Sequence, residues 1–119
     1  MKISEIKDML AETGVQATYS HWNEQDVPLL PYICWTLPSS NNFAADNKVY
    51  KQAEQLVIEL YTEARDFALE KTVADVLDAH ELVWDRDSNW ITSESMNETD
   101  FIVDVLIEPE TEQQEDNDG

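Results

Sequence analysis

Residues 55–80 read QLVIELYTEARDFALEKTVADVLDAH and hold the strongest strand signal of the chain, followed directly by its longest helix signal. The segment 55–62 is rich in β-branched and aromatic residues, which favours a strand. Thr62 can then cap a helix of about residues 63–80. We expect its inner stripe to consist of apolar side chains at helical spacing, namely Phe67, Val73, Ala74 and Leu77, broadened by Leu69 and Val76.

The flanking segments predict a second helix and further strands. Residues 2–13 repeat apolar side chains at helical spacing and end before Gly14, which suits the left-handed position after a helix. Alternation or β-branched and aromatic content predicts strands at 15–22, 31–37, 81–85, 89–94 and 101–108. Because helices and strands do not alternate, we expect an α+β fold: a mostly antiparallel sheet with one long helix packed on one face and a short N-terminal helix.

The segment WDRDSNW, residues 84–90, raises the question of a metal site, because Asp85, Asp87 and Asn89 stand at the spacing of the first ligands of a calcium loop. Such a loop requires glycine at its sixth position and glutamate at its twelfth, where this chain has Trp90 and Met96. Asp, Ser and Asn are also frequent in turns. We therefore interpret residues 85–89 as a turn between two strands and predict no metal site.

Length and composition predict one small domain. The chain has 119 residues, of which 42% are hydrophobic, so it can bury an ordinary core. We expect a single α+β domain over residues 1–107 and a disordered acidic tail over residues 108–119, which carry six acids and no base. The single Cys34 cannot form an internal disulfide and is expected to be buried. No signal region or membrane-spanning segment is expected, which favours synthesis in the cytoplasm.

The strongly acidic balance limits the partners. Lys and Arg number 7 and Asp and Glu 26, which gives a formal net charge of −19. Affinity for nucleic-acid phosphates comes from Lys and Arg, so direct binding to DNA or RNA is not expected. An acidic surface can repel nucleic acid, attract a basic partner or maintain solubility.

No pattern of catalytic, cofactor-binding or metal-ligating residues emerges. His21 and His80 stand alone without metal-ligand spacing, and Cys34 has no base nearby in the sequence. Gly14 and Gly119 are the only glycines, which excludes glycine-rich phosphate loops. We expect no enzyme activity, no cofactor and no membrane partner.

Aromatic residues in polar surroundings are the candidates for an interface. Trp35 lies in an apolar segment and is expected in the core. Trp22 precedes a polar loop, and Trp84 and Trp90 flank the predicted turn. Phe43 is an isolated apolar residue in the loop 38–48. Since tryptophan is enriched in interface hot spots, these four residues are candidate contacts, although partial burial explains the tryptophans equally well.

Three stretches together resemble a known family. NNFAADNKVYKQAEQLVIELYTEARDFALEKTVADVLD (41–78), WDRDSNWITSESMNETDFIVDVLI (84–107) and VPLLPYICWTLP (27–38) resemble the tail terminator, or tail completion and head–tail joining, proteins of long-tailed bacteriophages and their prophages. The resemblance covers roughly residues 15–107 and rests on the overall pattern rather than on a diagnostic motif.

The resemblance implies an α+β subunit of a ring, typically a hexamer, that caps the tail tube and docks it to the connector of the head. The implied partners are other copies of the chain, the tail-tube protein and the connector or stopper protein, with DNA passing through the bore. The implied location is the tail or neck of the virion. The family has no catalytic residues to assign to this sequence.

Two alternatives remain from the residues themselves. The acids along residues 63–81 also suit a DNA mimic that blocks a basic host protein. A regulatory module that binds a basic partner through residues 108–119 is the other alternative, and it would lose activity when that tail is deleted.

Overall fold

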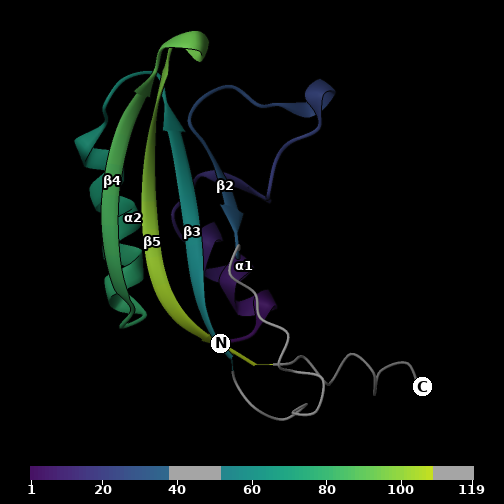
Figure 1. Cartoon of the computed structure of the whole chain (residues 1–119), viewed down its shortest axis with the longest axis vertical. Helices are drawn as coiled ribbons and strands as arrows, with labels where there is room; N and C mark the ends of the chain where they lie inside the picture. Colours follow the sequence, from purple (N-terminus) through teal and green to yellow (C-terminus); the bar gives the residue numbers. More distant parts are fainter. Residues whose placement is uncertain (38–51, 109–119) are drawn as a thin grey trace.

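The computed structural model describes residues 1–37 and 52–108 and contains two α-helices and five strands in these ranges (Figure 1). The helices and strands are α1 (Ile3–Ala11), β1 (Gln16–Tyr19), β2 (Tyr32–Thr36), β3 (Gln52–Thr62), α2 (Phe67–Ala79), β4 (Val83–Ile91) and β5 (Met96–Ile107). The predicted loop 38–48, with Phe43, and the tail from residue 109 lie outside the described residues. The division into a domain of residues 1–107 and a tail therefore stays a prediction.

All five strands join one sheet in the order β1-β2-β3-β5-β4. β1 pairs with β2 in parallel, whereas the other three pairs are antiparallel. The α+β class is confirmed, but the sheet is mixed rather than mostly antiparallel as the sequence predicted. The reason is the connection of residues 20–31, which contains the 3-10 turn Glu24–Asp26 and returns the chain so that β2 runs in the direction of β1.

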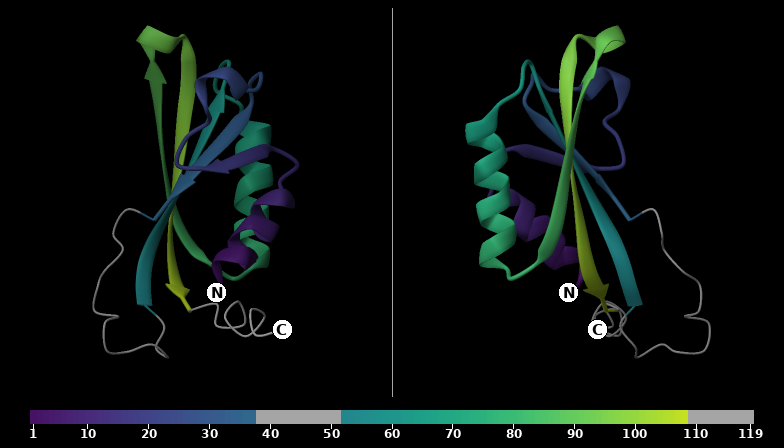
Figure 2. Two further views of the ribbon diagram at one scale, coloured as in Figure 1. Left: turned by 90° about the vertical axis from the view of Figure 1, so that its right-hand side faces the viewer. Right: turned by 60° about the vertical axis from the view of Figure 1, so that its left-hand side comes forward.

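Both helices pack on the same face of the sheet, and the described residues place no helix on the other face (Figure 2). The core lies between the helices and the sheet. Its fully buried side chains come from both layers and include Ile6, Met9, Leu10, Ile33, Leu56, Ile58, Leu60, Val73, Leu77, Phe101 and Val103. Trp35 is in this core and Cys34 is buried, as predicted. No helix in the described part of the chain is long and apolar enough to cross a membrane.

The helix α2 begins later than the sequence predicted. Thr62 continues β3, where it pairs with Asn97, and its hydroxyl donates to the carbonyl of Ala64 at 2.6 Å. The N-cap is Asp66 instead, because its carboxylate accepts a hydrogen bond from the backbone N–H of Leu69 at 3.0 Å. The predicted helix over 63–80 is therefore a helix of 13 residues, shorter than expected.

The buried stripe of α2 also differs from the expected one. Val73, Ala74 and Leu77 are buried as predicted, but the fourth member is Glu70, which is 1% exposed. Phe67 is 66% exposed and its ring lies 4.6 Å from the guanidinium of Arg65. The four buried residues stand at i, i+3, i+4 and i+7. Phe67 lies one turn earlier on the same side by spacing, but as the first residue of the helix it contacts Arg65 at the exposed helix end instead of the core.

Residues 85–89 do not form the predicted turn. Val83–Ile91 is one continuous strand, and the reversal follows in the 3-10 turn Thr92–Glu94, with Ser95 at φ +49°. WDRDSNW is in fact a period-two pattern. Asp85, Asp87 and Asn89 all point to the face without helices, so they do not converge on one point as calcium ligands would.

The first helix agrees with the sequence. α1 lies within the predicted range 2–13, and Gly14 has a φ of +79° in the turn that leads to β1. Its buried residues Ile6, Met9 and Leu10 repeat at helical spacing and pack into the core.

Candidate interaction face

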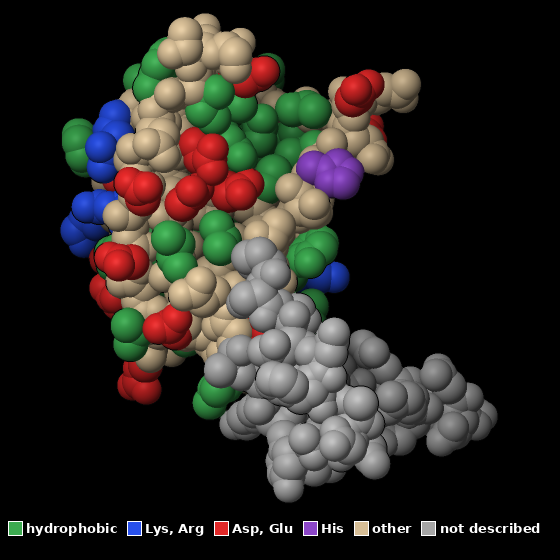
Figure 3. Space-filling model, viewed as in Figure 1, with side chains coloured by type: hydrophobic (Ala, Val, Ile, Leu, Met, Phe, Trp, Pro, Cys, Tyr) green, Lys and Arg blue, Asp and Glu red, His purple; other side chains and the backbone are tan. Residues whose placement is uncertain are grey.

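The face of the sheet that no helix covers carries two rows of polar and aromatic side chains. The cross-strand partners of the first row are Cys34, Glu59, Asp100 and Asp87, on β2, β3, β5 and β4 in turn. The second row consists of Tyr32, Tyr61, Glu98 and Asn89. Figure 3 looks onto this face and shows acidic side chains gathered beside hydrophobic ones, a class that includes tyrosine and tryptophan in its colouring. We call the acidic–aromatic face the surface formed by Trp22, Tyr32, Cys34, Glu59, Tyr61, Asp87, Glu98 and Asp100.

The acidic half of this face consists of Glu59, Asp87, Glu98 and Asp100, and it brings like charges close together. Oxygen atoms of Glu59, Glu98 and Asp100 lie within 4.8 Å of one another. Asp87 stands directly opposite Asp100 on the neighbouring strand. Like charges directly opposite each other destabilise a sheet. One oxygen of Asp100, Oδ1, is buried and has no hydrogen-bond partner among the described residues.

Protonation relieves part of this repulsion. Burial, a hydrogen bond with Glu98 and the charges of Glu98 and Asp87 raise the pKa of Asp100 to about 7. Burial also raises the pKa of Glu59, although the hydroxyl of Tyr61 counteracts this by donating a hydrogen bond at 2.9 Å. The cluster therefore holds a proton at mildly acidic pH and loses it near neutral pH.

The aromatic half lies next to the carboxylates. The rings of Tyr32 and Tyr61 are 5.3 Å apart, and Trp22 packs edge-on against Tyr32 at 6.1 Å. The indole N–H of Trp22 is buried without a hydrogen-bond partner among the described residues.

Burial and the charges of Glu59 and Glu98 raise the pKa of the Cys34 thiol to about 11. This thiol is therefore neutral and unsuited to be a nucleophile.

The basic residues lie elsewhere in the described structure. Arg65 and Arg86 both pair with Glu70 beneath α2, at 2.6 Å and 3.3 Å. Lys71 pairs with Asp75 on α2 at 2.9 Å, and Lys2 and Lys7 belong to α1 and its N-cap. No Lys or Arg of the described ranges therefore neutralises the acidic half.

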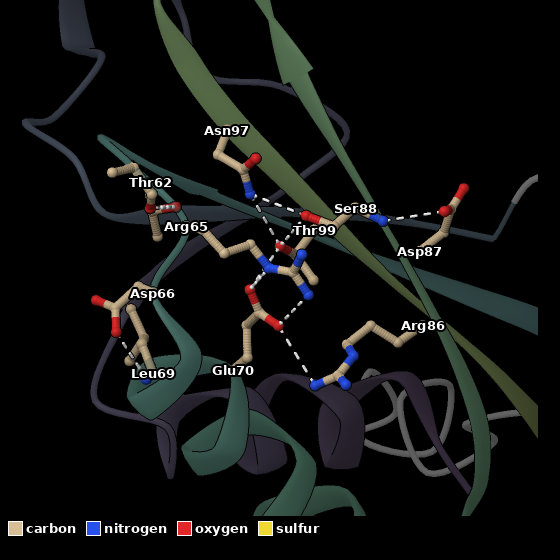
Figure 4. Close-up of polar contacts among 11 residues, drawn as sticks. Thr62, Arg65, Asp66, Leu69, Glu70, Arg86, Asp87, Ser88, Asn97 and Thr99 are labelled. Atoms are coloured by element: carbon tan, nitrogen blue, oxygen red, sulfur yellow. Dashed lines mark hydrogen bonds and ion pairs between the residues drawn. The ribbon is translucent and has the colours of Figure 1, made fainter.

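The polar cluster around Glu70 has a structural role (Figure 4). Arg65 donates to both carboxylate oxygens, and the hydroxyl of Thr99 donates to Oε2 at 3.1 Å. Arg86 completes the contacts from β4. A buried charge that is fully paired in this way ties α2 to the sheet, and no carboxylate oxygen remains for a ligand.

The four predicted interface residues are not brought together. Trp22 lies on the acidic–aromatic face, whereas Phe43 is outside the described residues. Trp84 lies on the helix side of β4, where its ring packs against Phe101 at 5.5 Å and its N–H donates to Asp78 at 2.8 Å. Trp90 is 54% exposed near the β4–β5 turn. Of the two histidines, His80 contacts Glu12 at 3.1 Å and His21 contacts Ser20 at the same distance.

The sequence analysis missed Glu59, Glu98 and Asp100. A signal was present, because side chains two residues apart on a strand share a face, which puts Glu98 and Asp100 on one side of their strand and Glu59 beside Tyr61 on the same side of theirs. Only the register of β3 against β5 shows that the two sets of acids meet. All-oxygen ligands suit a hard divalent cation, but three clustered carboxylates alone do not define a metal site.

Comparisons with known proteins give a likeness in fold. No protein-family model matches the chain, and no curated protein sequence matches it either. Among solved structures, the chain is similar to a chain of the "Virion of native gene transfer agent (GTA) particle". The two are 20% identical with a TM-score of 0.54, and the match covers 85% of this chain and 84% of the other. At this identity the likeness shows that the two chains share a fold.

Proposed function

We propose that this chain is a structural subunit of a phage-like virion, and that it acts as a tail terminator or head–tail joining protein. The observation that carries the proposal is the shared fold with a component of a gene transfer agent virion, which extends over most of both chains. The resemblance to tail-completion proteins in the sequence supports the same role. The position in the tail or neck of the particle is what the sequence resemblance implies, and the shared fold supports a place in the virion.

The form of the sheet supports assembly through its edges and its uncovered face. β1 and β4 are the outer strands of the sheet, and each has one side free of strand partners among the described residues. Open edges and an uncovered face can contact a neighbouring copy in a head-to-tail manner, which closes into a ring when the rotation is suitable. A hexameric ring that contacts the tail tube on one side and the connector on the other is the assembly we propose.

The acidic charge is compatible with DNA transit. A bore lined by carboxylates repels the phosphate backbone, so DNA passes without adhering. The paired carboxylates lie on an open face, and the Cys34 thiol is neutral, with its pKa raised to about 11 by burial and nearby acids. These features favour a structural role over catalysis.

The DNA-mimic alternative receives less support. A mimic needs carboxylates that are separate and ionised, whereas the carboxylate cluster found among the described residues has oxygen atoms within 4.8 Å of one another, and Asp100 within it keeps a proton up to about pH 7. A mimic would also bind its basic target as a defined small complex rather than assemble into a ring.

The test is deletion of the gene in the phage or prophage that carries it, followed by negative-stain microscopy of lysates. We expect filled heads beside unattached tails, or tubes of uncontrolled length, and rescue by the intact gene supplied in trans. Normal virions in the deletion strain would refute the proposed role. In that case, capture of a basic host protein becomes the next measurement.

A further inference from the structure

We propose that copies of this chain contact one another head to tail, with the loop of residues 27–31 of one copy seated in a pocket between α1 and β1 of the next copy. The inference deepens the proposed function and rests on it, since it assigns the contact through which the ring would close. The pocket, which we call the α1–β1 pocket, is lined by Lys7, Leu10, Ala17, Thr18, Tyr19 and Trp35. Residues 27–31 read VPLLP, and we call them the VPLLP loop.

The VPLLP loop presents an apolar side chain that the fold does not bury. Leu29 is 88% exposed and Val27 is 48% exposed. A lone exposed leucine is common on protein surfaces, but here all five residues of the run are apolar. In Figure 1 the connection between β1 and β2 (dark blue), which contains this loop, extends away from the sheet. Pro28 and Pro31 each have a fixed φ, so seating the loop in a partner costs less conformational entropy than seating a flexible segment would.

The α1–β1 pocket offers the matching space. It has a volume of about 410 Å³ and lies beside β1, one of the two outer strands of the sheet. Its lining includes Leu10 and Trp35, which are 1% and 3% exposed, and the ring of Tyr19 packs edge-on against that of Trp35 at 4.9 Å. Pockets of roughly 300–1,000 Å³ accommodate small-molecule ligands, so this one can hold Leu29 together with part of its neighbours. None of the lining residues belongs to the VPLLP loop, so the loop of the same copy does not fill the pocket.

The charges beside the two surfaces are complementary. Lys7 is exposed and has no ion-pair partner in the described part of the chain, and the pocket lining holds no acid. Glu24 and Asp26 are exposed in the 3-10 turn that directly precedes the VPLLP loop. Docking of the loop therefore brings acids of one copy toward the base of the next. Because the net charge of −19 makes two copies repel each other, a contact between copies is favoured where opposite charges match locally.

The loop and the pocket are different surfaces of one chain, which points to a second copy as the partner. Every copy carries one loop and one pocket, so the contact is heterologous and can be repeated from copy to copy. Such a series closes into a ring when the rotation between copies divides a full turn, and otherwise it forms a filament.

Two single variants make the contact measurable as a defined pair. Leu29→Glu disables the loop and keeps the pocket, whereas Lys7→Glu reverses the charge at the pocket and keeps the loop. The two full-length chains are mixed at up to about 1 mM, a range that reveals weak specific contacts, in about 0.15 M salt to screen the net charge. With nitrogen-15 in the Leu29→Glu chain, we expect the backbone signals of Ala17 and Tyr19 to shift until they saturate. With nitrogen-15 in the Lys7→Glu chain instead, the signal of Val27 should shift.

The same titration gives the strength of the contact. Each variant alone should self-associate at least about tenfold more weakly than the mixed pair, because either the burial of Leu29 or the attraction to Lys7 is missing. A single chain that carries Lys7→Glu, Glu24→Lys and Asp26→Lys should self-associate again, because the opposite charges are exchanged between loop and pocket.

Matched controls are added to the mixed pair. In the chain that supplies the loop, Leu106→Glu makes the same change as Leu29→Glu at another exposed leucine. In the chain that supplies the pocket, Lys71→Glu makes the same change of charge as Lys7→Glu on the surface of α2. Neither control should alter the affinity by more than about threefold, since distant surface charges contribute little. All of the substituted side chains are exposed, so the variants should fold, and circular dichroism checks this.

Three results would overturn the inference: no saturating shifts in the mixed pair at about 1 mM, equal weakening by the controls, or self-association of each variant as strong as that of the mixture. The second would mean that net charge or overall apolar surface governs association, and the third that copies meet through other surfaces. The deletion experiment described above has an independent readout. A deletion phenotype without this contact would leave the virion role standing, whereas the contact without a deletion phenotype would refute that role alone.

Discussion

Replacing Asp100 by asparagine should stabilise the protein at neutral and alkaline pH. The side chain keeps its size and can donate hydrogen bonds to the neighbouring carboxylates of Glu59 and Glu98, while one of the crowded charges disappears. Most substitutions on a sheet lower the free energy of unfolding. A gain at a half-buried position would therefore be a distinctive sign of the like-charge strain described here.

The magnitude follows from the raised pKa. Burial and the charges of Glu98 and Asp87 move the pKa of Asp100 from 3.8 to about 7. A tenfold change in acid strength corresponds to about 1.4 kcal/mol, so an unscreened shift would amount to roughly 4 kcal/mol. The side chain is only partly buried, and screening by solvent reduces the effect to about 1–2 kcal/mol.

The effect of Asp100→Asn on the free energy of unfolding should depend on pH, and the raised pKa of Asp100 gives the direction. Between about pH 4 and pH 7 the folded state binds more protons at Asp100 than the unfolded state does, so the free energy of unfolding falls as pH rises. The Asp100→Asn variant lacks this contribution. Its advantage should be small at pH 4 and complete above about pH 8.

Urea denaturation between pH 4 and pH 9, followed by circular dichroism, measures this difference. Asp104→Asn is the matched control, because Asp104 is an exposed carboxylate on the same strand and should change stability by less than about 0.5 kcal/mol. A loss of stability in Asp100→Asn at pH 8, or a gain equal to that of Asp104→Asn, would refute the reasoning.

Three further substitutions test the helix α2 by the same denaturation assay. Glu70→Gln should lower the free energy of unfolding by about 2–3 kcal/mol. This is a small loss for a broken buried ion pair, because Arg65 and Arg86 still reach solvent. An unchanged denaturation midpoint would contradict the structural role of the cluster. Asp66→Ala should cost about 1 kcal/mol through loss of the N-cap, and Asp66→Asn should restore most of it. Phe67→Ala should cost less than about 1 kcal/mol, since the ring is exposed and contacts only the Arg65 guanidinium among the contacts described; a loss of the size typical for a core phenylalanine, about 3–5 kcal/mol, would place Phe67 in the core after all.

The sequence predicted the fold class and the positions of most elements, because these depend on local pattern. The buried side of β5 and the first helix follow directly from period-two and helical spacing. The helix start was missed because two acceptable caps, Thr62 and Asp66, compete, and only the length of β3 decides between them. The parallel pairing of β1 with β2 depends on the path of the connecting loop, which residue type does not determine.

The candidate site was hardly predictable, because it depends on contacts between distant segments. WDRDSNW was interpreted as a turn from its residue types, although its alternation was that of a strand. In a chain with 26 acids, the proximity of Glu59 and Asp100 cannot be distinguished from chance without the β3–β5 register. Glu70 offered a better signal, since it continues the helical stripe of Val73, Ala74 and Leu77, and a charge on an apolar stripe calls for partners.

The position of β5 has a consequence for synthesis. This strand lies between β3 and β4 in the sheet, yet both neighbours precede it in the chain. Until residue 107 has left the ribosome, β3 presents Leu56, Ile58 and Leu60 without the strand that completes its pairing. At a synthesis rate of about 5–20 residues per second, the unpaired edge of β3 and its apolar side chains stay uncovered for seconds. This is long enough for chaperones or other nascent chains to bind them. Slow growth at low temperature and chaperone co-expression should therefore raise the soluble yield more than changes to the surface.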